Sequence, residues 1–102
     1  MKYGLNERDI DCILKAVQEF TEVERVIIFG SRAIGNYKKG SDIDLAIRGE
    51  NISKETITRL SGILNDELPL PYFFDVVDYK TISNNELKKH IDDNGKILFE
   101  KL

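Results

Sequence analysis

The chain has 102 residues, of which 41% are hydrophobic and 32% charged, and its formal net charge is −3. This length predicts one domain over residues 1–102, and no apolar run is long enough to span a membrane. The acidic balance argues against direct nucleic-acid binding, which relies on neutralising phosphates with lysine and arginine. The single cysteine, Cys12, excludes an intramolecular disulfide, and the N-terminus lacks the apolar stretch of a secretory signal, so we expect a cytoplasmic protein.

The first two elements are a helix and a buried strand. Apolar residues recur at helical spacing over residues 7–20, with Asn6 as the N-cap and Asp9 in the capping-box position. Residues 25–29, an arginine followed by four apolar and mostly β-branched residues, predict a strand buried on both faces. The strand ends at the dipeptide Gly30-Ser31, and a short helical turn is expected after it.

In residues 42–47 the polar Asp42 and Asp44 alternate with apolar residues, which predicts a second strand with Ile43, Leu45 and Ile47 on its apolar face. The link between the two strands is about a dozen residues, too short for a crossover helix. We therefore expect the two strands to pair antiparallel.

The second half of the chain continues with alternating helices and strands. We expect a helix over residues 54–67 capped by Ser53, a strand over 72–77 after two prolines, a helix opened by the capping box Ser83 to Glu86 and ended by Gly95, and a last strand over 97–99. This order predicts an α+β fold, a small mixed β-sheet with helices packed on one face.

Two carboxylates stand out in Ser41-Asp42-Ile43-Asp44-Leu45. Residues i and i+2 of a strand point to the same side, so Asp42 and Asp44 project together with Cα atoms roughly 7 Å apart. Carboxylates at this separation repel unless a cation lies between them, and Mg²⁺ prefers oxygen ligands. Taken alone, the pair would more often be a solvated strand face, so the interpretation depends on its neighbours in the sequence.

The dipeptide Gly30-Ser31 is the first of these neighbours. Glycine permits close backbone approach, and the N–H groups at a helix start, with a serine hydroxyl, bind phosphate oxygens. Arg32 either reaches a phosphate or forms an exposed ion pair, and Ser41 either touches a phosphate or caps a turn. Lys38 and Lys39, in the intervening loop, are more typical of a solvated loop than of a triphosphate site.

A third acid lies in the apolar run Phe73-Phe74-Asp75-Val76-Val77-Asp78. An acid flanked by apolar residues is costly without a partner, which favours Asp75 as a third metal ligand or as the base for an attacking hydroxyl. Asp78 falls on the other face near the strand end, where a turn-initiating role is favoured. His90, the only histidine, is expected on the surface of a polar helix.

These motifs together resemble the signature of the polymerase-β-like nucleotidyltransferase superfamily: Gly-Ser, a spacer of about ten residues, Asp-x-Asp, and a later acid. The form Gly30-Ser31-Arg32-Ala33 followed by Ser41-Asp42-Ile43-Asp44-Leu45 looks most like the minimal nucleotidyltransferases, the antitoxin halves of toxin–antitoxin pairs. The resemblance covers nearly the whole chain.

The resemblance implies a magnesium-dependent enzyme. Asp42, Asp44 and Asp75 would hold two Mg²⁺ ions, and Gly30 and Ser31 would bind the phosphates of ATP, with Arg32 and Ser41 close by. The implied reaction transfers AMP from ATP to a tyrosine hydroxyl of a partner, a HEPN-domain toxin, which silences the toxin.

Two other classes of function remain. A non-catalytic antitoxin would neutralise its toxin by binding alone, against which the three intact acids argue. A signalling receiver domain also clusters acids at strand ends, but it needs alternating parallel strands and helices. The short link between the first two strands argues against a receiver.

Overall fold

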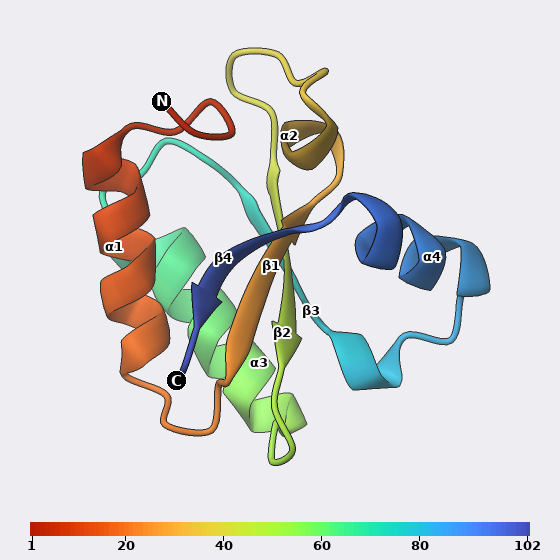
Figure 1. Ribbon diagram of the computed structural model, residues 1–102. Helices are drawn as coiled ribbons and strands as arrows, with labels where there is room; N and C mark the ends of the chain where they lie inside the picture. Colours follow the sequence, from red (N-terminus) through yellow and green to blue (C-terminus); the bar gives the residue numbers. More distant parts are fainter.

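A computed structural model describes every residue of the chain, 1–102. Figure 1 shows a twisted sheet in the centre of the molecule with helices on both sides. The helices are α1 (Glu7–Gln18), α2 (Ser31–Ile34), α3 (Lys54–Gly62) and α4 (Asn85–Asn94), and the strands are β1 (Arg25–Phe29), β2 (Ile43–Arg48), β3 (Phe74–Asp78) and β4 (Lys96–Glu100). A π-helical turn, η1 (Ile63–Glu67), continues α3, and a 3₁₀ turn, η2 (Tyr79–Thr81), follows β3.

The four strands form one mixed sheet in the order β3-β2-β1-β4. Strand β1 is antiparallel to both β2 and β4, whereas β2 and β3 run parallel. The antiparallel pairing of β1 with β2 confirms the prediction from the short link, and α3 provides the longer connection that the parallel pair requires. The α+β class and the mixed sheet are therefore confirmed, and the all-parallel sheet of a receiver domain is excluded.

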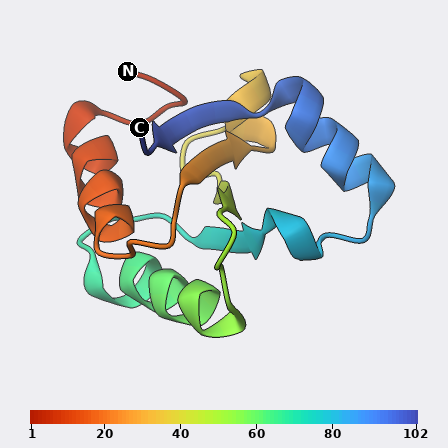
Figure 2. The ribbon, with the colours of Figure 1, turned by 60° about the horizontal axis from the view of Figure 1, so that its bottom comes forward.

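The two faces of the sheet carry separate apolar clusters. Helices α1 and α3 cover the first face, where Val26, Ile28 and Leu45 belong to the main core. Helix α4 covers part of the other face, where its Ile91 packs with Ile27. Figure 2 shows α4 on the opposite side of the sheet from α1 and α3. The expectation that all helices pack on one face is thus wrong for α4, because β1 is apolar on both faces and both need cover.

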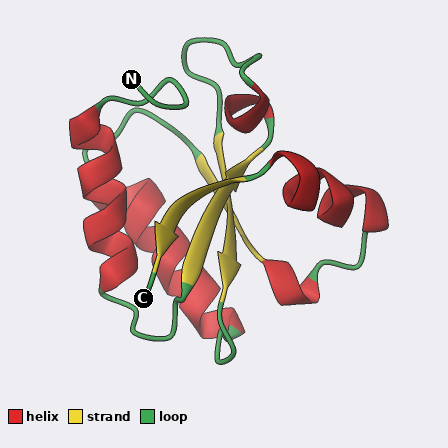
Figure 3. Ribbon diagram, viewed as in Figure 1, coloured by secondary structure: helices red, strands yellow, loops and turns green.

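Side-chain caps mark the first turn of three of the four α-helices, which Figure 3 draws in red. Asn6 caps α1 in the predicted capping box with Asp9, and Ser53 caps α3. The predicted cap of α4 is wrong by one residue: the Asn84 side chain, not that of Ser83, accepts the Leu87 N–H. None of the helices combines the length and the apolar character that crossing a bilayer requires.

Candidate active site

Acidic side chains gather at one end of the sheet, where β1 ends and β2 and β3 begin. Asp44 lies opposite Phe29 of β1 and is in register with Asp75 of the parallel strand β3. Asp42 comes immediately before β2, and by strand alternation it points to the same side as Asp44. The structure therefore brings the acids of two separate motifs to the same end of the sheet, which we call the acidic end.

Negative charge is crowded around Asp44. Its carboxylate is half-buried, and burial, followed by the negative charges of Asp75 and Asp42, raises the pKa of Asp44 above its usual value. An ionised Asp44 is consequently destabilised by its surroundings. A bound cation would relieve this electrostatic cost.

The bend at Gly30 lies directly against this carboxylate. Gly30 has φ +73°, a left-handed conformation that favours glycine. A Cβ atom at this position would overlap the Oδ2 atom of Asp44. Gly30 is therefore required both by its backbone torsion and by the close approach of the bend to the acid.

Arg32 is buried, so the exposed ion pair that the sequence offered as one of its two roles is wrong. The residue is 3% exposed, and its guanidinium donates to the Ser41 carbonyl at 2.7 and 3.1 Å and to the Tyr3 carbonyl at 2.9 Å. The same guanidinium lies over the rings of Tyr37 and Tyr72, at 5.3 and 4.9 Å from their centroids. Because these contacts engage all three guanidinium nitrogens, the structure favours a clamp on the loop before Asp42 over a phosphate contact.

The remaining sequence candidates lie in or beside that loop. The Ser41 hydroxyl accepts the Lys38 N–H at 2.8 Å, so it caps a turn, which was one of its two expected roles. Lys38 and Lys39 are exposed, as expected for a solvated loop. The hydroxyl of Ser31 hydrogen-bonds to no group of the chain and remains available to a ligand.

His90 is a member of this site that the sequence did not reveal. Its Nε2 accepts the Gly30 backbone N–H at 2.9 Å, and its ring meets the Phe29 ring edge-on with centroids 6.1 Å apart. The prediction of a simple surface position is therefore wrong, since the ring is half-buried against β1. A polar helix carrying a lone histidine gives no local signal of this contact, because 60 residues separate His90 from Gly30.

The carboxylates of Asp42, Asp44 and Asp75 at the acidic end of the sheet suit a hard divalent cation. Carboxylate oxygens are the ligands that Mg²⁺ prefers, and the crowded charge at Asp44 supplies the electrostatic reason for binding one. In the observed side-chain conformations, no three His, Cys, Asp or Glu residues of the chain converge at metal-binding geometry. Asp42 and Asp75 are exposed and can turn toward a shared ion.

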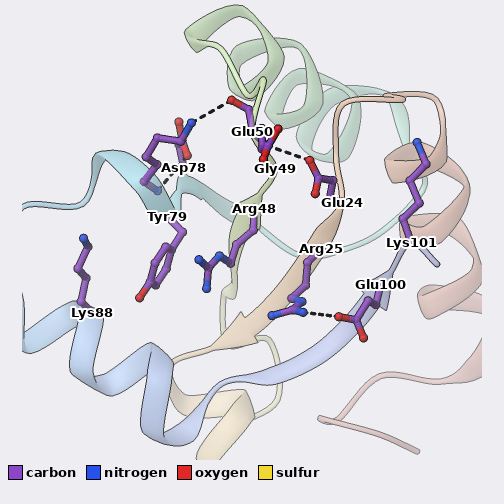
Figure 4. A pocket seen from close by; sticks show the side chains of 11 residues that line it. Glu24, Arg25, Arg48, Gly49, Glu50, Asp78, Tyr79, Lys88, Glu100 and Lys101 are labelled. Atoms are coloured by element: carbon purple, nitrogen blue, oxygen red, sulfur yellow. Dashed lines mark hydrogen bonds and ion pairs between the residues drawn. The ribbon is translucent and has the colours of Figure 1, made fainter.

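A charged cleft of about 490 Å³ occupies the opposite end of the sheet (Figure 4). Its charges are largely engaged within the chain: Arg25 pairs with Glu100, and the Arg48 guanidinium lies 4.1 Å from the Tyr79 ring centroid. Asp78, also in this cleft, accepts the Lys80 N–H and so has the turn role expected for it. We therefore take the acidic end of the sheet as the candidate active site.

Comparison with known proteins points to one family. The family model described as "Polymerase beta, Nucleotidyltransferase" matches residues 11–102. No curated protein matches the chain.

Three solved structures share the fold. A toxin–antitoxin crystal structure with AMP-PNP is 24% identical, with a TM-score of 0.72, covering 95% of this chain and 75% of that one. A toxin–antitoxin named MntA–HepT is 19% identical, with a TM-score of 0.70, covering 94% and 74%. The tri-AMPylated Shewanella oneidensis HEPN toxin in complex with MNT antitoxin is 19% identical, with a TM-score of 0.71, covering 95% and 74%.

Proposed function

Because the chain belongs to the polymerase beta nucleotidyltransferase family, we propose that it transfers AMP from ATP to a protein hydroxyl group, a tyrosine of a HEPN-type toxin. In this role it is the antitoxin of a toxin–antitoxin pair. The similar structures support the proposal, since one contains AMP-PNP and another an AMPylated HEPN toxin bound to an MNT antitoxin. ATP and the toxin would both be met in the cytoplasm.

The observation that carries the proposal is the register of the acids beside the bend. Asp44 and Asp75 are paired across β2 and β3, and Gly30 lies against the Asp44 carboxylate. A phosphate held at the bend would thus lie next to the acids. Strands, which are stiffer than loops, hold Asp44 and Asp75 in place.

Asp42, Asp44 and Asp75 are the residues that would hold divalent metal ions, two Mg²⁺ by the family resemblance. When bound, such ions neutralise phosphate charge and stabilise the attacking and leaving oxygens of the displacement. The three carboxylates would supply the negative charge that binds the metal ions and would fix the positions of these ions.

The chain's own residues would handle the nucleotide and the proton. The free hydroxyl of Ser31 would donate to a phosphate oxygen next to the bend. The acceptor hydroxyl oxygen forms a bond to the α-phosphorus, and the bond from that phosphorus to the bridging oxygen breaks, so that pyrophosphate leaves with the electron pair. The Asp75 carboxylate would accept the proton of the acceptor hydroxyl. The products are an AMP-tyrosine ester and pyrophosphate.

Label transfer tests the proposal directly. The protein is incubated with α-labelled ATP, Mg²⁺ and a HEPN-type toxin, and the toxin is examined for label. We expect Asp42→Ala and Asp44→Ala to lower transfer on the order of 10²–10³-fold, since each removes charge stabilisation at the reacting phosphate. Asp78→Asn is the matched control, an acid of the same sheet outside the site, and should retain transfer.

The outcomes separate the proposal from its alternative. Loss of label on chelation with EDTA would support metal dependence. A wild-type protein that binds and neutralises the toxin without labelling it would instead establish an antitoxin that acts by binding alone.

A further inference from the structure

The hydrogen bond from α4 to the Gly30 bend has a consequence for how the site binds phosphate. The Gly30 N–H is the first backbone donor of the bend, and His90 Nε2 already accepts it at 2.9 Å. Gly30 is the N-cap of α2, and as a glycine it has no side chain that could cap the helix. His90 is therefore the group that satisfies this amide.

The contact requires one tautomer of the ring. A neutral imidazole that accepts through Nε2 must carry its proton on Nδ1. The Asn94 side-chain amide lies 3.5 Å from Nδ1, one turn further along α4. Turned so that its oxygen faces the ring, this amide would accept the Nδ1 proton, since amide oxygen and nitrogen are assigned from such networks.

The ring is also fixed by packing. The Phe29 ring meets it edge-on at an interplanar angle of 72°, and Phe29 is itself 6% exposed. Phe29 is the last residue of β1, directly before Gly30 and directly opposite Asp44. A shift of His90 would therefore move the bend and the strand end that faces the acid.

We propose that His90 is a positioning residue that holds the Gly30–Ser31 bend against Asp44 by accepting the Gly30 N–H in its Nδ1-protonated tautomer. This inference rests on the proposed function of the same site. Gly30 then contributes its shape and not its N–H to the phosphate site, and the phosphate donor beside it is the Ser31 hydroxyl. His90 acts through Gly30 and does not touch the nucleotide.

Nuclear magnetic resonance on the ¹⁵N-labelled full chain tests the hydrogen bond, because His90 is the only histidine. We expect the neutral ring to carry its proton on Nδ1 and not on Nε2, and a scalar coupling between the Gly30 nitrogen and Nε2. Both signals should persist with Mg²⁺ and AMP-PNP bound. A protonated Nε2 with a bare Nδ1 would overturn the proposal, and so would loss of the coupling on nucleotide binding, since a phosphate would then have taken the amide.

Variants test the consequence for binding. His90→Phe keeps a ring against Phe29 but removes the acceptor. The bend is then no longer held in place before binding, and because ordering it on binding costs free energy, we expect a roughly five- to tenfold higher Kd for AMP-PNP with Mg²⁺. His90→Gln keeps an acceptor of similar reach and should stay within about threefold of the wild type. Lys89→Ala, an exposed neighbour on α4, is the matched control and should bind as the wild type does.

The outcomes for His90 are separate from those for the transfer reaction. Equal Kd values for His90→Phe and the wild type would refute the positioning role even if label transfer proceeds. A failure of label transfer would refute the proposed function and leave the tautomer and the coupling to be decided on their own. If His90→Phe does not fold, the resonance measurements on the wild-type chain decide.

Discussion

Replacement of Arg32 should destabilise the chain far more than replacement of an exposed arginine. Arg32 is 3% exposed, and two backbone carbonyls, those of Ser41 and Tyr3, depend on it for hydrogen bonds. Hydrogen bonds to a charged group contribute roughly 1.5–3 kcal/mol each. Part of this loss is recovered, because both carbonyls belong to half-buried residues that water can reach and because a buried charge is removed. We therefore expect Arg32→Met to lower the free energy of unfolding by about 2–4 kcal/mol.

Urea denaturation followed by circular dichroism measures this change. For a slope on the order of 1.5 kcal/mol/M, the midpoint should fall by roughly 2 M. Arg32→Lys should lose about half as much, because an ammonium on a flexible stem cannot serve both carbonyls in the fork geometry of arginine.

Arg59→Met is the matched control for the same chemical change. The Arg59 guanidinium lies 5.1 Å from the Phe20 ring centroid, is exposed, and donates no hydrogen bond. Such an exposed cation–π contact contributes about 0.5–1 kcal/mol. Equal, small losses for Arg32→Met and Arg59→Met would show that the carbonyl contacts contribute little, and the clamp interpretation would be wrong.

Three further predictions concern the acidic end of the sheet and a helix cap. Because the pKa of Asp44 is raised in the folded chain, stability should fall as pH rises through the unfolded and then the raised folded pKa. Asp44→Asn should therefore raise the urea midpoint at pH 7, and this gain should vanish below about pH 4; a gain independent of pH would contradict the assigned cause. Gly30→Ala combines left-handed strain with overlap on Asp44, whereas Gly35→Ala at φ +88° has open space around it. Thermal melting should therefore show a clearly larger loss of stability for Gly30→Ala. Equal losses of stability would argue against the close approach of the bend to Asp44. Asn6→Ala should cost about 1 kcal/mol in urea denaturation by removing the α1 cap, and an unchanged midpoint would show the cap to be dispensable.

Local patterns in the sequence were sufficient for most elements. The apolar run at Arg25–Phe29 predicted β1 with its observed bounds, and the alternation after Ser41 predicted β2 to within one residue. These predictions succeeded because strand and helix periodicity is a property of neighbouring residues. The cap of α4 was misplaced because Ser83 and Asn84 are both good caps, and only the geometry of the turn selects between them.

The sequence by itself also predicted the candidate site, since an Asp-x-Asp pair after a Gly-Ser bend suits a divalent cation and a phosphate. The tertiary structure alone decided the rest: the register that places Asp75 beside Asp44, the second covered face, the burial of Arg32, and the contact of His90 with Gly30. Each of these is set by side chains that pack from distant parts of the chain. The periodicity and spacing of neighbouring residues do not encode these long-range contacts, because the contacts depend on how the helices and strands pack together.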